Sequence, residues 1–363
     1  INRAMIEIPP KFAGLTPVSL QQSRQGGKKK ELDFGREWPG ATGLAEDVRY
    51  YGAWMREEAH KRIGYLYPPV EITAEIAKER PDLKSLVGQK LTVIAWLWAR
   101  TVKSPNPAFS HLDVPLATSF VLSSKAGKEA YVEPVIQGDR YDFRVKIGQF
   151  DEDAKSGTKL ARGSFKCLLS DAVISYSYIN EEADSKRMGA RLMAVVAEGA
   201  KGRIWLSPSE EMQQVALSAR PSWKPEIPTW GTGGSNAIGR RYGFNVFGDY
   251  FTARQLVLLT TLSELVLETR EKAKAMATAA GMIDDGIILS KNGSGADAYA
   301  DGIAVYLAFM VDQVANHSAS VCGWNSANAQ MRSVFARQVI PMTWDYAECN
   351  AFSDSSGSYN NLL

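Results

Sequence analysis

The sequence predicts an α+β fold: a β-rich, ribbon-like region followed by a mainly helical C-terminal part. Short runs of β-branched and aromatic residues, separated by turn residues, fill positions 91–180. Beyond residue 184 the apolar residues instead recur at helical spacing. With 363 residues, 45% of them hydrophobic and 23% charged, the chain can bury a substantial core. We therefore expect a globular protein of two or three domains.

The first 90 residues are expected to contain a short helix or strand, one basic linker and a helical segment. Pro9 and Pro10 should stop a short helix or strand, because a residue before proline avoids the α region. Residues 20–40 are polar, contain glycine and carry the basic run Lys28, Lys29 and Lys30, so we predict a linker or mobile loop there. An apolar face predicts a helix at 44–62.

The β-rich region is expected to be mostly antiparallel. Its strands are predicted at 91–99, 119–122, 131–136, 141–146 and 173–176.

Helices are expected to dominate the remainder. The predicted helices cover 188–200, a segment that begins at Ser207-Pro208-Ser209, a long stretch from the N-cap Thr252 to about 280, and then 296–316 and 328–337. A short strand at 202–206 and a loop at 220–243, rich in Gly, Trp and Pro, interrupt them.

Composition excludes several classes of protein. The net charge of +2 comes from 42 basic and 40 acidic residues, which supports neither an acidic partner nor histone-like binding of nucleic acid. Three scattered cysteines do not make a disulfide framework, so we expect a reducing cytoplasm. No apolar run approaches the ~20 residues of a membrane span.

Motifs for self-contained chemistry are missing from the sequence. The three histidines lack metal-ligand spacing, and there is no Gly-x-Ser-x-Gly nucleophile motif. The glycine-rich segment 231–239 lacks the Lys-Ser/Thr of a phosphate loop, so a flexible loop is the favoured interpretation. The start at Ile1 predicts an interior piece of a larger protein, with a processed N-terminus as the alternative.

Six segments, taken in order, resemble prokaryotic adenine-specific DNA methylases with a zinc-ribbon insertion, a group often found in anti-phage defence clusters. They are 2–12, 43–52, 93–102, 187–199, 251–256 and 344–348. In that family the loop that binds S-adenosylmethionine precedes the equivalent of Ile1. The Asp-Pro-Pro-Tyr motif that handles the flipped adenine follows the equivalent of Leu363.

The resemblance implies a cytoplasmic prokaryotic protein whose partner is DNA, in a restriction-modification or anti-phage system with other defence proteins. The chain would be the non-catalytic central region of an adenine-N6 methyltransferase. It would use S-adenosylmethionine only as part of the full-length enzyme, and would be inactive alone. On this basis the segments are the end of the first catalytic half with its linker (1–40), a helical segment (41–90), a degenerate ribbon (91–180) and an α-rich target-recognition region (181–363).

The zinc ribbon departs from the family pattern. Where the family has Cys-Pro-Asn-Pro-x-Cys this chain has Ser104 to Phe109, and where the family has Cys-x-x-Cys it has Cys167 to Ser170. Three of the four thiolates are gone, and a serine hydroxyl does not replace a thiolate on Zn²⁺. We therefore expect the zinc site to be lost, and the ribbon to be held by apolar residues such as Phe109, Phe120 and Leu169. Cys167 should then be an ordinary buried thiol.

The best candidates for DNA contact are the two arginines and the tyrosine that follow the glycine-rich segment, and then the start of the long helix. These residues are Arg240, Arg241, Tyr242, Thr252, Arg254 and Gln255. The alternatives are that Arg240 and Arg241 are solvated and that Arg254 pairs with a carboxylate. For Gln255 the structural role is favoured. Lys28, Lys29 and Lys30 could add non-specific attraction, although a solvated loop is the favoured interpretation.

Three further residues lie near the expected start of the second catalytic half: Trp344, Asp345 and Glu348. They either border the base pocket or, as the safer interpretation, cap and pack a helix, since an aromatic and two acids stand at helical spacing. The main alternative function for the whole chain is a DNA- or protein-binding scaffold of a defence complex.

Overall fold

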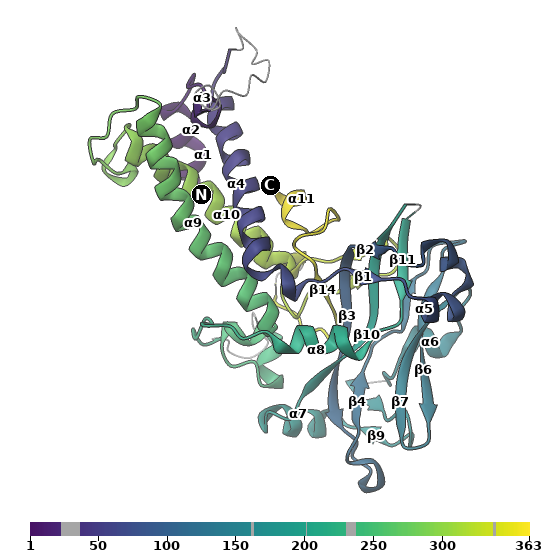
Figure 1. Ribbon diagram of the computed structural model, residues 1–363. Coiled ribbons are helices and arrows are strands. Elements are labelled where there is room, and N and C mark those ends of the chain that lie inside the picture. Colours follow the sequence, from purple (N-terminus) through teal and green to yellow (C-terminus); the bar gives the residue numbers. More distant parts are fainter. Residues whose placement is uncertain (23–36, 161–162, 201, 230–236, 337–338) are drawn as a thin grey trace. The chain divides into compact units, whose positions relative to one another are not determined.

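The computed structural model describes residues 1–22, 37–160, 163–200, 202–229, 237–336 and 339–363. They form an α+β fold of helices and several small antiparallel sheets (Figure 1). The chain divides into two compact units, each built from separate stretches of sequence. The first comprises Ile1–Gly64, Leu258–Val314 and Leu362–Leu363, and the second Tyr65–Val257 and Ala315–Asn361. The four successive segments expected from the sequence do not coincide with these units.

The first unit is helical. It contains α4 (Thr42–Ile63), the greater part of α9 (Ala253–Ala279) and of α10 (Ala296–His317), and the short helices α1 (Asn2–Ile6), α2 (Ile8–Lys11), α3 (Val18–Gln22) and η7 (Leu289–Lys291).

One buried carboxylate joins three segments of the first unit. Asp47 on α4 accepts hydrogen bonds from the N–H groups of Val18 (2.7 Å) and Ser19 (3.0 Å) and from the Tyr299 hydroxyl on α10. The Tyr299 ring in turn meets the edge of Phe12 at 5.1 Å between centroids. Since a buried charge is tolerated only when it is hydrogen-bonded, these contacts fix the N-terminal segment against α4 and α10.

The main sheet of the second unit is built around β3 (Val93–Lys103). One edge of β3 pairs with β10 (Gly189–Gly199), which in turn pairs with β11 (Gly202–Leu206). The other edge pairs with β14 (Asp345–Cys349) and then with β4 (Asp113–Leu116). Ten of the eleven residues of β3 are buried, so both faces of the strand are covered. This explains why its sequence is an unbroken apolar run rather than an alternating one.

Smaller sheets surround this one in the second unit. They are the meander β5 (Val121–Ser123), β6 (Ala130–Gln137) and β7 (Arg140–Ile147), and the pairs β1 (Val70–Glu71) with β2 (Lys90–Leu91), β8 (Phe165–Lys166) with β9 (Val173–Ile174), and β12 (Trp324–Asn325) with β13 (Gln330–Met331).

The remaining helices are short. They are α5 (Ala74–Glu79), α6 (Glu152–Ser156), α7 (Tyr176–Asp184), α8 (Glu210–Ser218) and α11 (Tyr359–Leu362), with the 3-10 turns η1 (Gly64–Leu66), η2 (Pro81–Leu86), η3 (Pro107–Phe109), η5 (Ile238–Tyr242), η6 (Phe247–Tyr250) and η8 (Val334–Ala336).

Several sequence predictions are confirmed. The helices at 44–62 and 296–316 are α4 and α10, and the helix after Ser207-Pro208-Ser209 is α8, whose first turn is capped by the Ser209 side chain. The long helix is α9, and Gly281 just beyond it has a φ of +93°. The strands expected at 91–99, 131–136, 141–146 and 202–206 are β3, β6, β7 and β11.

The helix predicted at 188–200 is wrong, because this segment is the strand β10. Six consecutive residues of β10, Leu192 to Ala197, are buried. A strand buried on both faces has no polar side, so its apolar residues can be mistaken for a helical stripe. Pairing with both β3 and β11 then overrides the helix propensity of Leu, Met and Ala.

Three other predictions in this unit are also corrected. The described part of the helix expected at 328–337 instead contains the two-residue strand β13 and the turn η8. Residues 344–348 do not form a helix, because β14 pairs with β3 along its whole length. The strand expected at 173–176 is only two residues long, since Ser175 caps α7 through its side chain and turns the chain into a helix.

Candidate nucleic-acid interface

The start of α9 is closed by the chain's own side chains. The backbone N–H of Gln255 donates to the Thr252 hydroxyl oxygen at 3.2 Å, and the Gln255 side chain accepts from the Thr252 N–H at 2.9 Å. This reciprocal pair is a capping box, so the N-cap predicted at Thr252 is confirmed.

The carboxylate of Glu348 on β14 lies beside the N-terminal cap of α9. Its Oε1 accepts from the Thr252 hydroxyl at 2.7 Å, and its Oε2 accepts from the Trp98 indole N–H at 3.0 Å. A helix N-terminus attracts a negative group. Here the chain supplies that group itself.

Arg254 completes this buried cluster. Its guanidinium donates to both carboxylate oxygens of Glu348, at 3.1 and 2.7 Å, and to the Leu66 carbonyl at 2.9 Å. The guanidinium carbon lies 3.9 Å from the centroid of the Trp96 ring. Burial acts to lower the pKa of Arg254, but the charge and hydrogen bonds of Glu348 outweigh it and raise that pKa.

The cluster leaves neither Arg254 nor Gln255 accessible. Both side chains are 1% exposed. The alternative that Arg254 pairs with a carboxylate is therefore confirmed, and Gln255 has the structural role favoured from the sequence. Glu348 likewise belongs to this cluster rather than to an open pocket.

Arg240, Arg241 and Tyr242 lie on the turn η5, which packs against α7. Both arginines are exposed, whereas Tyr242 is buried. Gly243 closes the turn with a φ of +79°, and a Cβ at this position would come within 2.8 Å of the Ala183 carbonyl oxygen on α7. Glycine is therefore what allows η5 to approach α7 so closely.

Tyr176, at the first position of α7, joins this turn to form one exposed surface. Its ring meets the edge of Tyr242 at 5.7 Å and is 36% exposed. Hydrogen bonds from Tyr242 and, more weakly, from the Arg241 guanidinium lower the pKa of the Tyr176 phenol against the raising effect of burial. We call Tyr176, Arg240 and Arg241 the tyrosine–arginine face.

Tyr176 is the member of this face that sequence reasoning missed. The segment 173–176 was predicted as a strand, which hid the start of α7. The Ser-Tyr-Ser-Tyr sequence from 175 to 178 carries an N-cap signal at Ser175 that could have placed the helix.

Aromatic contacts continue inward from the tyrosine–arginine face. The Tyr242 ring meets Trp344 at 4.7 Å between centroids, and Trp344 meets Phe165 at 5.3 Å. Tyr242, Phe165 and Cys167 belong to one apolar cluster, with Trp344 packed against it. Trp344 thus supports the face from behind rather than lining a pocket.

Asp345 lies next to Trp344 at the start of β14. Its carboxylate accepts hydrogen bonds from the Thr118 N–H at 2.9 Å and the Thr118 hydroxyl at 2.5 Å. Burial raises the pKa of Asp345 to about 6, although these two hydrogen bonds act to lower it. A carboxyl group with such a pKa changes charge close to neutral pH.

The positions compared with the zinc ribbon come together in the structure. The Ser104 hydroxyl oxygen lies 3.4 Å from the Cys167 sulfur, although the residues are 63 positions apart. Burial acts to raise the pKa of Cys167, but hydrogen bonds from Ser104, from Ser170 and from the backbone N–H groups of Leu169 and Ser170 lower it. Cys167 is buried and forms no disulfide.

Apolar packing around Cys167 only partly matches the expectation. Leu169 packs against the cluster that contains Cys167, whereas Phe120 belongs to the other large cluster of the second unit and Phe109 is half-buried. Within the described part of the chain, no three His, Cys, Asp or Glu side chains gather as a group that could hold a metal ion.

Lys28, Lys29 and Lys30 lie outside the described residues. Among those that are described, no helix has the length and apolar character needed to cross a membrane. Comparisons of the chain with models of protein families, with curated proteins and with solved structures find no match.

Proposed function

We propose that this chain is the DNA-holding, non-catalytic central region of an S-adenosylmethionine-dependent DNA adenine-N6 methyltransferase in a restriction-modification or anti-phage system. Such enzymes extrude the target base and must grip the DNA beside the catalytic fold. Here the tyrosine–arginine face offers two exposed guanidinium groups for phosphates and an exposed ring for stacking. Of the proposed DNA contacts that the structure describes, Arg240 and Arg241 remain, with Tyr242 supporting them from within.

The contact between Ser104 and Cys167 is the observation that carries the proposal. The resemblance pairs these residues with ligands of one zinc ion. Two thiolates at about 2.3 Å from a tetrahedral zinc lie roughly 3.8 Å apart. The 3.4 Å separation of the Ser104 oxygen and Cys167 sulfur is close to that value. This closeness of two positions 63 residues apart supports the proposal.

Restoring the lost thiolates tests the resemblance. The variant Ser104→Cys, Phe109→Cys and Ser170→Cys should bind one zinc ion together with Cys167, because a structural site needs four ligands. Cobalt substitution, followed by its absorption spectrum, reports the number of thiolates. The matched control adds Cys167→Ala and should bind far more weakly. A folded triple variant that takes up no cobalt would contradict the resemblance.

DNA binding is tested by affinity over a range of salt concentrations. Each neutralised phosphate contributes about 0.9 to the slope of log affinity against log salt, so Arg240→Ala with Arg241→Ala should reduce the slope by roughly two. Arg140→Ala with Arg144→Ala, both exposed on β7, removes the same charge elsewhere and is the control. An unchanged slope would remove the arginine pair from the proposed interface and favour the scaffold alternative.

An assay of methyl transfer tells whether this chain only binds DNA or also catalyses the reaction. With labelled S-adenosylmethionine and duplex DNA, this chain alone should transfer no methyl group. If this chain alone labelled the DNA, and a mutation in the chain abolished that labelling, the non-catalytic role would be refuted.

A further inference from the structure

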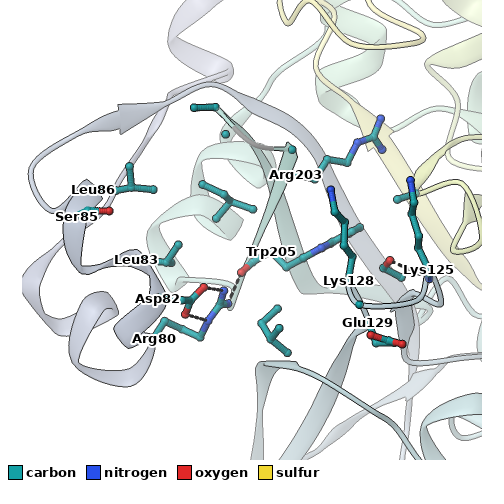
Figure 2. A pocket seen from close by; sticks show the side chains of 18 of the residues that line it. Arg80, Asp82, Leu83, Ser85, Leu86, Lys125, Lys128, Glu129, Arg203 and Trp205 are labelled. Carbon is teal, nitrogen blue, oxygen red and sulfur yellow. Dashed lines mark hydrogen bonds and ion pairs between the residues drawn. The ribbon is translucent and has the colours of Figure 1, made fainter.

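A second place in the second unit has the shape and charge of a ligand site. It is a pocket of about 620 Å³ between the turn η2, the connection from β5 to β6, and the end of the β10–β11 hairpin. Figure 2 shows Lys125, Lys128 and Arg203 on one side of this pocket, and Leu83 and Leu86 on the other. The pocket therefore has a cationic side and an apolar side.

One of the four cations that line the pocket is already engaged. Arg80 forms a two-pronged ion pair with Asp82, at 2.8 and 2.7 Å, and donates to the Trp205 carbonyl at 2.7 Å. These contacts hold η2 against β11. Arg80 and Asp82 therefore shape the wall and neutralise each other.

The other three cations have no carboxylate partner in the described part of the chain. Lys125, Lys128 and Arg203 form no ion pair there, and the Nη1 atom of Arg203 is buried without a hydrogen-bond partner among those residues. The Arg203 guanidinium carbon lies 5.5 Å from the Trp324 ring centroid. A buried guanidinium nitrogen without a partner is costly, so Arg203 keeps a hydrogen-bonding capacity that no described residue uses.

Lys128 lies on the same side of the pocket as Arg203, close to the backbone of Gly202. Gly202 has a φ of +130°, and a Cβ there would lie 3.5 Å from the Lys128 Nζ atom. Lys128 from the β5–β6 connection thus reaches the turn that carries Arg203. Glu129 is the one carboxylate lining the pocket that Arg80 does not engage, which leaves a surplus of two positive charges.

We propose that this pocket binds a small phosphorylated molecule of mononucleotide size, with its phosphate at Lys125, Lys128 and Arg203 and its nucleoside over Leu83 and Leu86. A phosphate monoester carries about two negative charges near neutral pH and offers three acceptor oxygens, which matches the surplus of charge and the unpaired donor. Pockets of roughly 300 to 1,000 Å³ hold ligands of this size, with apolar walls and a few polar anchors. This site is independent of the proposed DNA interface.

Calorimetric titration with AMP tests the site, with adenosine and inorganic phosphate as partial ligands. AMP should bind more tightly than either part. A charge-assisted hydrogen bond is lost in Arg203→Gln, so this variant should weaken AMP binding about tenfold or more. Arg203→Lys keeps the charge and should retain part of the affinity. Arg144→Gln, an exposed arginine on β7 outside the pocket, should bind as the unaltered chain does.

The outcomes distinguish the parts of the proposal. Absence of AMP binding at millimolar concentration, or equal binding by Arg203→Gln, overturns it. Adenosine binding as tightly as AMP overturns the phosphate assignment, and phosphate binding as tightly as AMP overturns the nucleoside assignment. A 5′-phosphorylated oligonucleotide that binds more tightly than AMP identifies a nucleic-acid end, not a free nucleotide, as the source of the phosphate. Thermal unfolding of each variant confirms that it is folded.

Discussion

Two of the places in the second unit where an arginine lies beside aromatic rings differ in how accessible the arginine is. Around Arg254 the guanidinium lies against Trp96, is paired with Glu348 and is 1% exposed. On the tyrosine–arginine face, Arg241 contacts Tyr176 at the surface. The same residue types thus build an internal support in one place and an accessible cationic surface in the other. Exposure, rather than residue type, separates the two.

The largest expected effect breaks the buried cluster. Glu348→Ala leaves the Arg254 guanidinium buried without its counter-charge, which should lower the free energy of unfolding by about 3 to 5 kcal/mol. Urea denaturation measures this. The double variant Arg254→Met with Glu348→Leu removes both charges and should recover most of the loss. A loss below about 1 kcal/mol for Glu348→Ala would contradict a supporting role for the pair.

The next largest effect is expected at Gly243, which lets η5 pack closely against α7 beneath the tyrosine–arginine face. Gly243→Ala places a Cβ at a φ of +79° and within 2.8 Å of the Ala183 carbonyl oxygen, so we expect a loss of about 2 kcal/mol. Gly138→Ala is the control, since its φ of +63° is similar but a Cβ there has no neighbour within 4 Å. Equal losses for the two variants would mean that backbone strain alone, and not the approach of η5 to α7, requires Gly243.

A pH-dependent effect is expected at Asp345, on the strand that also carries Glu348. Its folded pKa of about 6 exceeds the ordinary value of 3.8, so the folded state binds the proton more readily. The stabilisation that Asp345 contributes is therefore fully present at a pH below 3.8 and is lost as the pH rises through about 6.

Asp345→Asn should remove this loss of stability at high pH, because asparagine carries no charge. Because the residue keeps part of its surface open to water, we expect a gain of only about 1 to 2 kcal/mol at pH 8 and none at pH 4. Thermal or urea unfolding at both pH values measures the change, with Asp312→Asn, an exposed carboxylate on α10, as control. A variant less stable than the parent at pH 8 would show that the Thr118 hydrogen bonds outweigh burial.

The smallest effect is on the stability of the exposed face itself. Arg240→Ala with Arg241→Ala should change the free energy of unfolding by less than about 0.5 kcal/mol per residue, because surface substitutions seldom cost more. Urea denaturation of this pair beside Glu348→Ala gives the comparison directly. A large loss would place these arginines among the structural residues, with Arg254.

The sequence predicted the long, capped helices and the apolar central strand, because caps, periodicity and unbroken apolar runs are local signals. It failed at β10 and β14, where pairing with β3 decides the conformation and no local pattern reports it. For the same reason the sequence left open whether Arg254 contacts DNA or pairs with a carboxylate. The partner of Arg254 stands 94 positions away, and only the folded chain brings it close. Tyr176 was missed because the strand predicted at 173–176 hid the start of α7. The cationic pocket was missed because its residues come from several separate connections.

The order of strands in the main sheet has a consequence for synthesis on the ribosome. β14 covers one edge of β3, and its Glu348 is synthesised 250 positions after Trp98 of β3. Until then part of a highly apolar strand has an edge without its final partner, and such edges invite pairing with other chains. A nascent or truncated chain that stops before β14 should therefore aggregate more readily than the complete fold.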